Sequence, residues 1–220
     1  MSKKTFSIII PVKDEEQFYI NRVVKNIKKI FKNSRYEIIF SKTQDDKIYF
    51  NDKNIKVVNS PQGRGVQLNY GAKNSKGEIL IFLHCDTILP ENAERLILEN
   101  IEDNAILSFK YSTYPDKFIF KLIEFFTNLR CSITKTPYGD QCFIMKREVF
   151  EKLGGFPEEE LEDVKFVKKA KKMGIKIKIL NEKIKTSPRK YFRQGILKTI
   201  INHRVTIVRY MIDEFFKNTL

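Results

Sequence analysis

The sequence predicts an α/β fold in which helices flank a mixed, mostly parallel sheet. Two observations predict this fold. Short apolar runs, typical of strands buried on both faces, alternate with segments whose apolar residues recur at helical spacing. This alternation is the βαβ arrangement, which produces parallel strands. The 220 residues are enough for one such domain with a full core, and no internal repeat or Pro/Gly/Ser-rich linker interrupts it.

The first half of the chain begins with an apolar strand at 6–12. A helix opens at Asp14-Glu15-Glu16, and its apolar residues keep helical spacing up to Phe31. A second helix opens at the glycines Gly63 and Gly65 and runs to about residue 74. The remaining apolar runs predict strands at 36–40, 55–58 and 79–83.

The second half continues the alternation. Its patterns predict helices at 91–101, 117–130, 147–153 and 161–173, and strands at 105–111, 142–145 and 175–180. We divide the chain into a domain of residues 1–188 and a C-terminal segment of residues 189–220. That segment predicts a long amphipathic helix at 191–217. This helix either packs on the domain or lies on a membrane surface, and the sequence leaves both open.

Charge is concentrated near the C-terminus. The net charge is +14, and residues 183–212 contain eight Lys and Arg residues and no Asp or Glu. A basic cluster of this kind suits anionic partners such as nucleotide diphosphates, acidic membranes or nucleic acid. A Lys-rich composition would also raise the total, so the clustering is the more informative observation.

The cysteines indicate the compartment. Cys85, Cys131 and Cys142 are odd in number and lack CxxC spacing, which argues against a disulfide framework and a structural zinc site. The first apolar run ends at Lys13, too early for a signal peptide. No uncharged apolar stretch reaches the roughly 18 residues of a membrane span. We therefore expect a cytoplasmic protein, peripheral at the inner face of the membrane if its C-terminal helix binds lipid.

The strand at 79–83 ends abruptly in His84-Cys85-Asp86. Open α/β sheets bind their ligands at the carboxyl ends of such strands. Asp86 is therefore a candidate ligand-binding residue, although capping of the following turn would also explain it.

Three further segments combine turn residues with charge. Pro11-Val-Lys-Asp14 precedes a helix that Asp14 could cap, and the same loop could hydrogen-bond a nucleoside. Before the helix at 63–74, glycines expose backbone N–H groups to phosphate and Arg64 adds charge. The segment matches neither GxGxxG nor GxxxxGK[ST], which disfavours a dinucleotide-binding fold or a P-loop. The acids Glu162 and Asp163 stand at a helix start, where capping is the usual role.

Taken in order, these segments form a recognisable series: SIIIPVKDEE, GRGVQLNYGA, FLHCDT, YGDQ, GGFP and LEDV. The series resembles the inverting, family 2-like glycosyltransferases of GT-A fold. It is similar in particular to a compact bacterial subgroup with the blocks IIIPxxNE, GRxxQxNxGA, FLHADT, YGDQ, GGFP and ED. The resemblance covers about residues 6–173. It implies a GT-A-type single domain that moves a sugar from a nucleotide-sugar donor to an acceptor hydroxyl with inversion.

The resemblance also implies roles for individual residues. Asp86 would hold a divalent cation, Mg²⁺ or Mn²⁺, against the donor diphosphate, and His84, at the first position of the family's DxD motif, would be the second metal ligand. Asp163 would be the general base, with Glu162 beside it. Such a base takes the proton of the attacking hydroxyl and raises the reaction rate about 10²–10⁴-fold.

Further residues are implied to contact the substrates. Asp140 and Gln141 would lie near the acceptor or the donor sugar. In many relatives, the second strand ends in an acidic residue that contacts the nucleobase. The corresponding segment 39–46 has no acidic residue at that position. The nucleobase therefore stays open. Residues implied to lie along the nucleotide are Pro11, Val12, Glu15, Arg64 and Asp86.

Two other classes of function compete with this interpretation. A nucleotidyltransferase of related fold would have a Gly-rich basic loop after the first strand, and Pro11-Val-Lys-Asp14 lacks the glycines. A non-catalytic basic module for membranes or nucleic acid would leave the ordered motifs unexplained, and we expect no nucleic-acid partner. The acceptor is not indicated: the basic C-terminal helix favours a lipid-linked one. His203 in that helix is either structural or a metal ligand.

Overall fold

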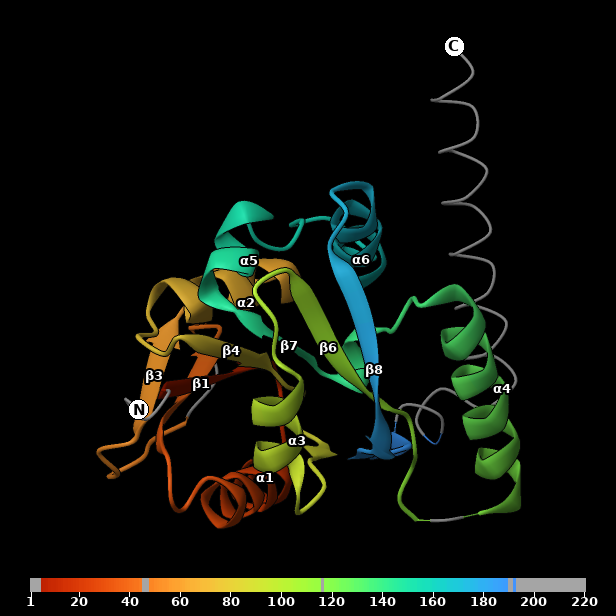
Figure 1. Ribbon diagram of the computed structural model, residues 1–220. Helices are drawn as coiled ribbons and strands as arrows, with labels where there is room; N and C mark the ends of the chain where they lie inside the picture. Colours follow the sequence, from red (N-terminus) through yellow and green to blue (C-terminus); the bar gives the residue numbers. More distant parts are fainter. Residues whose placement is uncertain (1–4, 45–47, 116, 190–191, 193–220) are drawn as a thin grey trace. The chain divides into compact units, whose positions relative to one another are not determined.

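The computed structural model describes residues 5–44, 48–115, 117–189 and 192 (Figure 1). Residues 1–186 form one compact unit and residues 187–220 a second. Only the first unit is described below. The predicted helix at 191–217 lies, apart from residue 192, outside the described residues, as does His203. The proposed division at residue 188 therefore stays a prediction.

A seven-stranded mixed sheet forms the centre of the first unit, in the order β3-β2-β1-β4-β7-β6-β8 (Figure 1). Strand β7 runs antiparallel to both of its neighbours, and the other adjacent pairs are parallel. This confirms the mixed, mostly parallel sheet that the sequence predicts. The strands are β1 (Thr5–Val12), β2 (Arg35–Lys42), β3 (Ile55–Asn59), β4 (Ile79–Phe82), β6 (Ala105–Lys110), β7 (Phe143–Lys146) and β8 (Lys176–Lys183).

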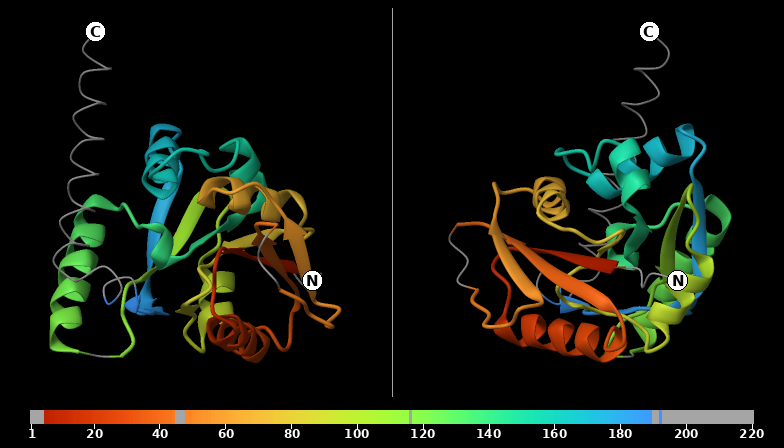
Figure 2. Two further views of the ribbon diagram at one scale, coloured as in Figure 1. Left: turned by 180° about the vertical axis from the view of Figure 1, so that it is seen from behind. Right: turned by 60° about the vertical axis from the view of Figure 1, so that its left-hand side comes forward.

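Helices cover both faces of the sheet. Side chains alternate along β1, so Ile8 and Ile10 pack into one core and Ile9 into another. Helices α1 and α3 lie on the first face, and α2, α5 and α6 lie on the opposite face (Figures 1 and 2). The helices are α1 (Gln17–Ile30), α2 (Arg64–Lys73), α3 (Ala93–Asn100), α4 (Phe118–Thr134), α5 (Arg147–Lys152), α6 (Glu162–Lys172) and the 3₁₀ turn η1 (Gly139–Gln141).

Two features differ from the sequence prediction. Helix α4 continues to Thr134, four residues beyond the predicted end, and closes at Lys135, whose φ of 49° is left-handed. A small antiparallel sheet of β5 (Thr87–Ile88) and β9 (Lys185–Thr186) was not predicted, since two-residue strands carry no readable period. Within the described residues, no helix is long and apolar enough to cross a membrane.

Candidate active site

The predicted site residues gather at one edge of the sheet. Strands β1 and β4 are adjacent and parallel, so their carboxyl ends open on the same side. The loop after β1 carries Pro11 and Glu15, and the loop after β4 carries His84 and Asp86. The start of α6 and the turn η1 reach the same place. Motifs that are far apart in the sequence therefore share one location.

Asp163 is fixed at this location by backbone hydrogen bonds. Its Oδ2 accepts from the N–H of Gly139 at 2.8 Å, and its Oδ1 accepts from the N–H of Val164 at 2.8 Å. A Cβ added to Gly139 would stand 3.1 Å from His84 Nε2 and 3.5 Å from Asp163 Oδ2. A carboxylate offers about four acceptor positions, so Asp163 can also accept from a substrate hydroxyl. The N-cap of α6 is Leu161; Asp163 lies in the first turn, where its bond to Val164 also serves the helix start.

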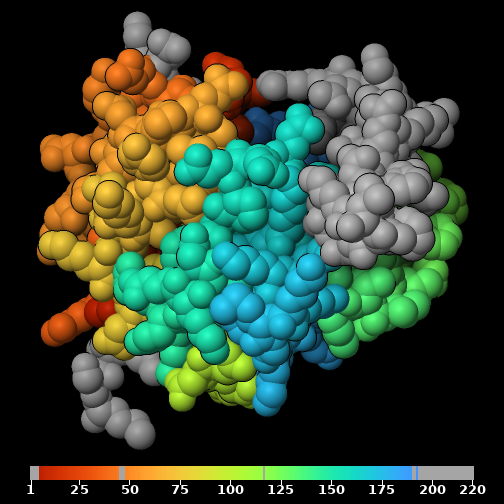
Figure 3. All heavy atoms as spheres, turned by 90° about the horizontal axis from the view of Figure 1, so that it is seen from above, coloured from red at the N-terminus to blue at the C-terminus, as the bar shows by residue number. Residues whose placement is uncertain are grey.

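Arg64 and Glu162 form an ion pair next to Asp163. Arg64 Nη1 lies 3.1 Å from Glu162 Oε1. A Cβ on Gly65 would stand 2.0 Å from the carbonyl oxygen of Pro157, so only glycine allows α2 to come this close. In Figure 3 the orange-to-yellow α2 region lies against the teal and cyan α5–α6 region. Burial raises the pKa of Glu162, and the Arg64 charge opposes that shift.

Asp140 is the most perturbed carboxyl of the site. Burial raises its pKa to about 6, nearby Asp163 and Asp86 add to the shift, and Arg130 and Arg64 oppose it. Its Oδ1 is buried and has no hydrogen-bond partner within the part of the chain that the structure describes. Buried polar atoms rarely stay without a partner, so this oxygen favours a bound ligand.

Asp86 is half-buried directly after β4. The Thr186 hydroxyl lies 3.4 Å from its Oδ1 and 3.1 Å from Thr87 Oγ1. Asp86 stands in the turn between β4 and β5, so capping of that turn stays the alternative role. Across the described ranges, no group of three or more His, Cys, Asp or Glu side chains is arranged to hold a metal. Mg²⁺ sites that are completed by substrate phosphates need only one or two carboxylates, and Asp86 fits such a site.

The predicted site residue Gln141 and the motif residue Asn69 serve the fold. Gln141 is fully buried, its Nε2 donates to Phe109 O at 3.1 Å, and its Oε1 accepts from Tyr138 N–H at 3.2 Å. This amide is engaged inside the protein, so we leave Gln141 out of the proposed sugar contacts. Asn69 of the GRGVQLNYGA block bonds both the backbone N–H and the carbonyl of Phe156, each at 2.9 Å.

The loop after β1 departs from one sequence prediction. Asp14 does not cap α1: the N-cap is Glu16, and Asp14 has a φ of 52°. The side chain of Val12 is buried and its carbonyl accepts from Gln67 Nε2 at 2.6 Å. Pro11 and Glu15 are half-buried at the end of β1.

Arg130 belongs to the site's surroundings and was not predicted. Its guanidinium lies 3.7 Å from the centre of the Tyr138 ring, and its Nη1 donates to Thr136 O at 2.7 Å. Its charge also opposes the burial that raises the pKa of Asp140. The sequence signal that could have indicated Arg130 was a charged residue near the end of a mostly apolar helix.

This fold and site define the class of protein. The family model for glycosyl transferase family 2 matches residues 7–154, which is more than half of the chain. The chain therefore belongs to glycosyl transferase family 2, and the predicted family and enzyme class are confirmed. The match ends before Glu162 and Asp163, so those two residues rest on the structure and the sequence motifs.

Solved structures share the fold. Residues 1–349 of TarS from S. aureus match with a TM-score of 0.62 and 22% identity, over 83% of this chain and 60% of that one. The mannosyltransferase PcManGT from Pyrobaculum calidifontis, in complex with GDP-Man and Mn²⁺, matches with a TM-score of 0.64 and 18% identity, over 83% and 56%.

A mutant of Drosophila β-1,4-galactosyltransferase 7, in complex with manganese, UDP-Gal and xylobiose, matches with a TM-score of 0.55 and 13% identity, over 80% of this chain and 64% of that one. Since the chain spans only part of these proteins at low identity, the likeness establishes the fold. No curated protein sequence matches this chain.

Proposed function

We propose that the chain transfers a sugar from a nucleotide-sugar donor to an acceptor hydroxyl, with inversion at the anomeric carbon. The observation that carries this proposal is the Asp163 carboxylate, oriented by Gly139 beside His84. Family membership supports sugar transfer. The structures of PcManGT with GDP-Man and of TarS with UDP-GlcNAc support a nucleotide-sugar donor.

Asp163 is the proposed general base. An acceptor hydroxyl is a poor nucleophile at neutral pH, so its proton passes to the Asp163 carboxylate while its oxygen attacks the anomeric carbon. The bond from that carbon to the nucleoside diphosphate oxygen breaks, and attack from the opposite side inverts the centre. Glu162 is buried and paired with Arg64, so it is the weaker candidate for the base and instead holds Arg64 in place.

The leaving diphosphate requires positive charge. Arg64 is the first residue of α2, where backbone N–H groups and the helix dipole also favour anions. Asp86 would hold a divalent cation, Mg²⁺ or Mn²⁺, together with the donor's phosphates. When bound, such a cation would neutralise charge that develops on the departing group.

The other candidates complete the proposed substrate contacts. Pro11, Val12 and Glu15 stand at the end of β1, where nucleosides bind in open α/β sheets. Asp140 is the proposed contact to the acceptor or donor sugar, since its buried Oδ1 has no hydrogen-bond partner among the described residues.

A screen of nucleotide sugars with Mn²⁺, Mg²⁺ or EDTA tests this function. We expect one donor to raise the Tm in a cation-dependent manner and to be slowly hydrolysed with release of a nucleoside diphosphate. Release of pyrophosphate from a nucleoside triphosphate would indicate nucleotidyl transfer instead. Absence of stabilisation by UDP-, GDP-, dTDP- and CDP-sugars would contradict the proposal.

A further inference from the structure

Helix α4 turns its apolar side outward. Its large apolar residues recur every three or four positions, which places them on one side of the helix. They are 41% to 78% exposed. We call this set the α4 stripe: Phe118, Ile119, Leu122, Phe125, Phe126, Leu129 and Ile133.

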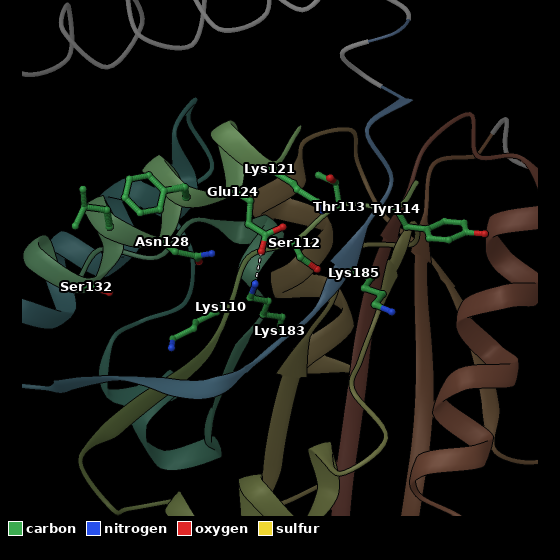
Figure 4. Close-up of a pocket in the computed structure, with 12 residues that line it drawn as sticks. Lys110, Ser112, Thr113, Tyr114, Lys121, Glu124, Asn128, Ser132, Lys183 and Lys185 are labelled. Atoms are coloured by element: carbon green, nitrogen blue, oxygen red, sulfur yellow. Dashed lines mark hydrogen bonds and ion pairs between the residues drawn. The ribbon is translucent and has the colours of Figure 1, made fainter. Parts of the chain in front are cut away.

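The side of α4 that faces the protein carries the buried Phe120 and Cys131 together with polar residues, and polar contacts hold it there. The Asn128 side chain accepts from the N–H of Tyr111 at 2.8 Å and donates to its carbonyl at 2.9 Å. Glu124 forms an ion pair with Lys183 of β8 (Figure 4). Rotating the helix to bury the α4 stripe would break these contacts at a considerable cost. A contiguous exposed apolar surface of this kind marks an interaction site.

A basic cavity of about 750 Å³ adjoins the stripe. Four lysines line it against one glutamate, Glu124, and hydroxyl side chains line it as well (Figure 4). Phe125 and Leu129 of the α4 stripe line it as well, so charged and apolar surfaces meet in one place. The lysines and hydroxyls are Lys110, Lys121, Lys183, Lys185, Ser112 and Thr113.

The cavity lining has a neighbour in common with the candidate active site. Thr113 lines the cavity and forms a β-bridge with Thr186. The Thr186 hydroxyl lies 3.4 Å from Asp86 Oδ1. The cavity lining is therefore linked to Asp86 through Thr113 and Thr186.

We propose that the cavity and the α4 stripe bind a phosphate-bearing lipid acceptor at an anionic membrane surface. The lysines take the lipid phosphate, the α4 stripe lies among the acyl chains at the interface, and a headgroup hydroxyl is the acceptor. Charge complementarity favours this occupant, since a second copy of the chain would bring its own lysines against these. The acceptor role depends on the proposed function, whereas membrane binding is measured separately.

Vesicle sedimentation of the full chain tests the proposal, with phosphatidylcholine alone or mixed with phosphatidylglycerol. We expect binding only to the mixed vesicles. The double variants Phe125→Ser/Phe126→Ser and Lys121→Glu/Lys185→Glu should each weaken it by at least about tenfold. The control variants Leu98→Ser and Lys25→Glu alter an exposed apolar residue of α3 and an exposed lysine of α1, and should retain binding.

Three outcomes would overturn the proposal. Equal binding by both stripe and control variants would show that α4 does not contact lipid. Tight binding of soluble glycerol phosphate without vesicle binding would make the ligand a soluble phosphate. A large drop in Tm of Phe125→Ser/Phe126→Ser without any change in vesicle binding would show that protein covers the stripe. Tm shifts with nucleotide sugars, measured on the same variants, report the proposed donor function independently.

Discussion

Asp163 Oδ2 accepts a hydrogen bond from the backbone N–H of Gly139 at 2.8 Å, across 24 residues of sequence. Because Gly139 has no side chain, His84 also approaches this position. The contact therefore joins three sequence motifs: the start of α6, the η1 turn and the end of β4. It gives Asp163 a fixed orientation, which a general base requires.

Asp86→Ala should weaken Mn²⁺-dependent nucleotide binding by at least about tenfold, or ~1.4 kcal/mol. The fold should change little, since Asp86 is half-buried in the loop after β4. Calorimetry with UDP and GDP, with and without Mn²⁺, measures the effect. Thr186→Val is the matched control, because it removes the 3.4 Å contact with Asp86 Oδ1 and keeps the carboxylate. Unchanged metal-dependent affinity in Asp86→Ala would remove Asp86 from the cation site.

Asp140→Asn should stabilise the protein more at pH 8 than at pH 4.5. The folded-state pKa of Asp140 is about 6, above the ordinary 3.8, so the folded state binds this proton more tightly than the unfolded state. Stability linked to Asp140 is therefore present at low pH and is lost as the pH rises through about 6. The amide removes this loss and should raise the free energy of unfolding at pH 8 by about 3 kcal/mol.

Urea denaturation at the two pH values measures this difference. The exposed Glu151→Gln is a matched carboxyl-to-amide control. A gain that is equal at both pH values, or a loss of stability at pH 8, would contradict the raised pKa of Asp140.

Asn69→Ala should lower the free energy of unfolding by about 1–3 kcal/mol, because it leaves the buried backbone groups of Phe156 without partners. Phe156 also stacks on Phe166 of α6, so the loss should loosen the start of that helix. Urea unfolding is the measurement, with the exposed Asn51→Ala as control. Equal stability of the two variants would show that the Asn69 bonds contribute nothing.

The sequence predicted the main sheet and most helices because each has a readable pattern. The five-residue apolar run before His84 gave β4, and its abrupt end indicated the site. The sheet of Thr87–Ile88 and Lys185–Thr186 was missed, since its pairing depends on contacts 99 residues apart. Helical spacing predicted α4 but could not tell which side faces the protein.

The sequence likewise predicted some of the site residues and could not resolve others. Motif order indicated Asp86, Asp163 and Arg64 as neighbours, and the structure brings them to one edge of the sheet. The order of the motifs could not distinguish Asp140 from Gln141, which are adjacent in the YGDQ motif. Burial of the Gln141 amide and the absence of a partner for Asp140 Oδ1 within the described residues separate them.

The measurement that tests the central claim most directly compares donor binding with turnover in Asp163→Asn. Once the donor is known, nucleoside diphosphate release reports turnover and calorimetry reports donor affinity. The account predicts unchanged affinity and turnover at least about a hundredfold lower, as expected for loss of a general base. Glu162→Gln is the matched control and should be milder. Small and equal losses in both variants would contradict the assignment of Asp163 as the base.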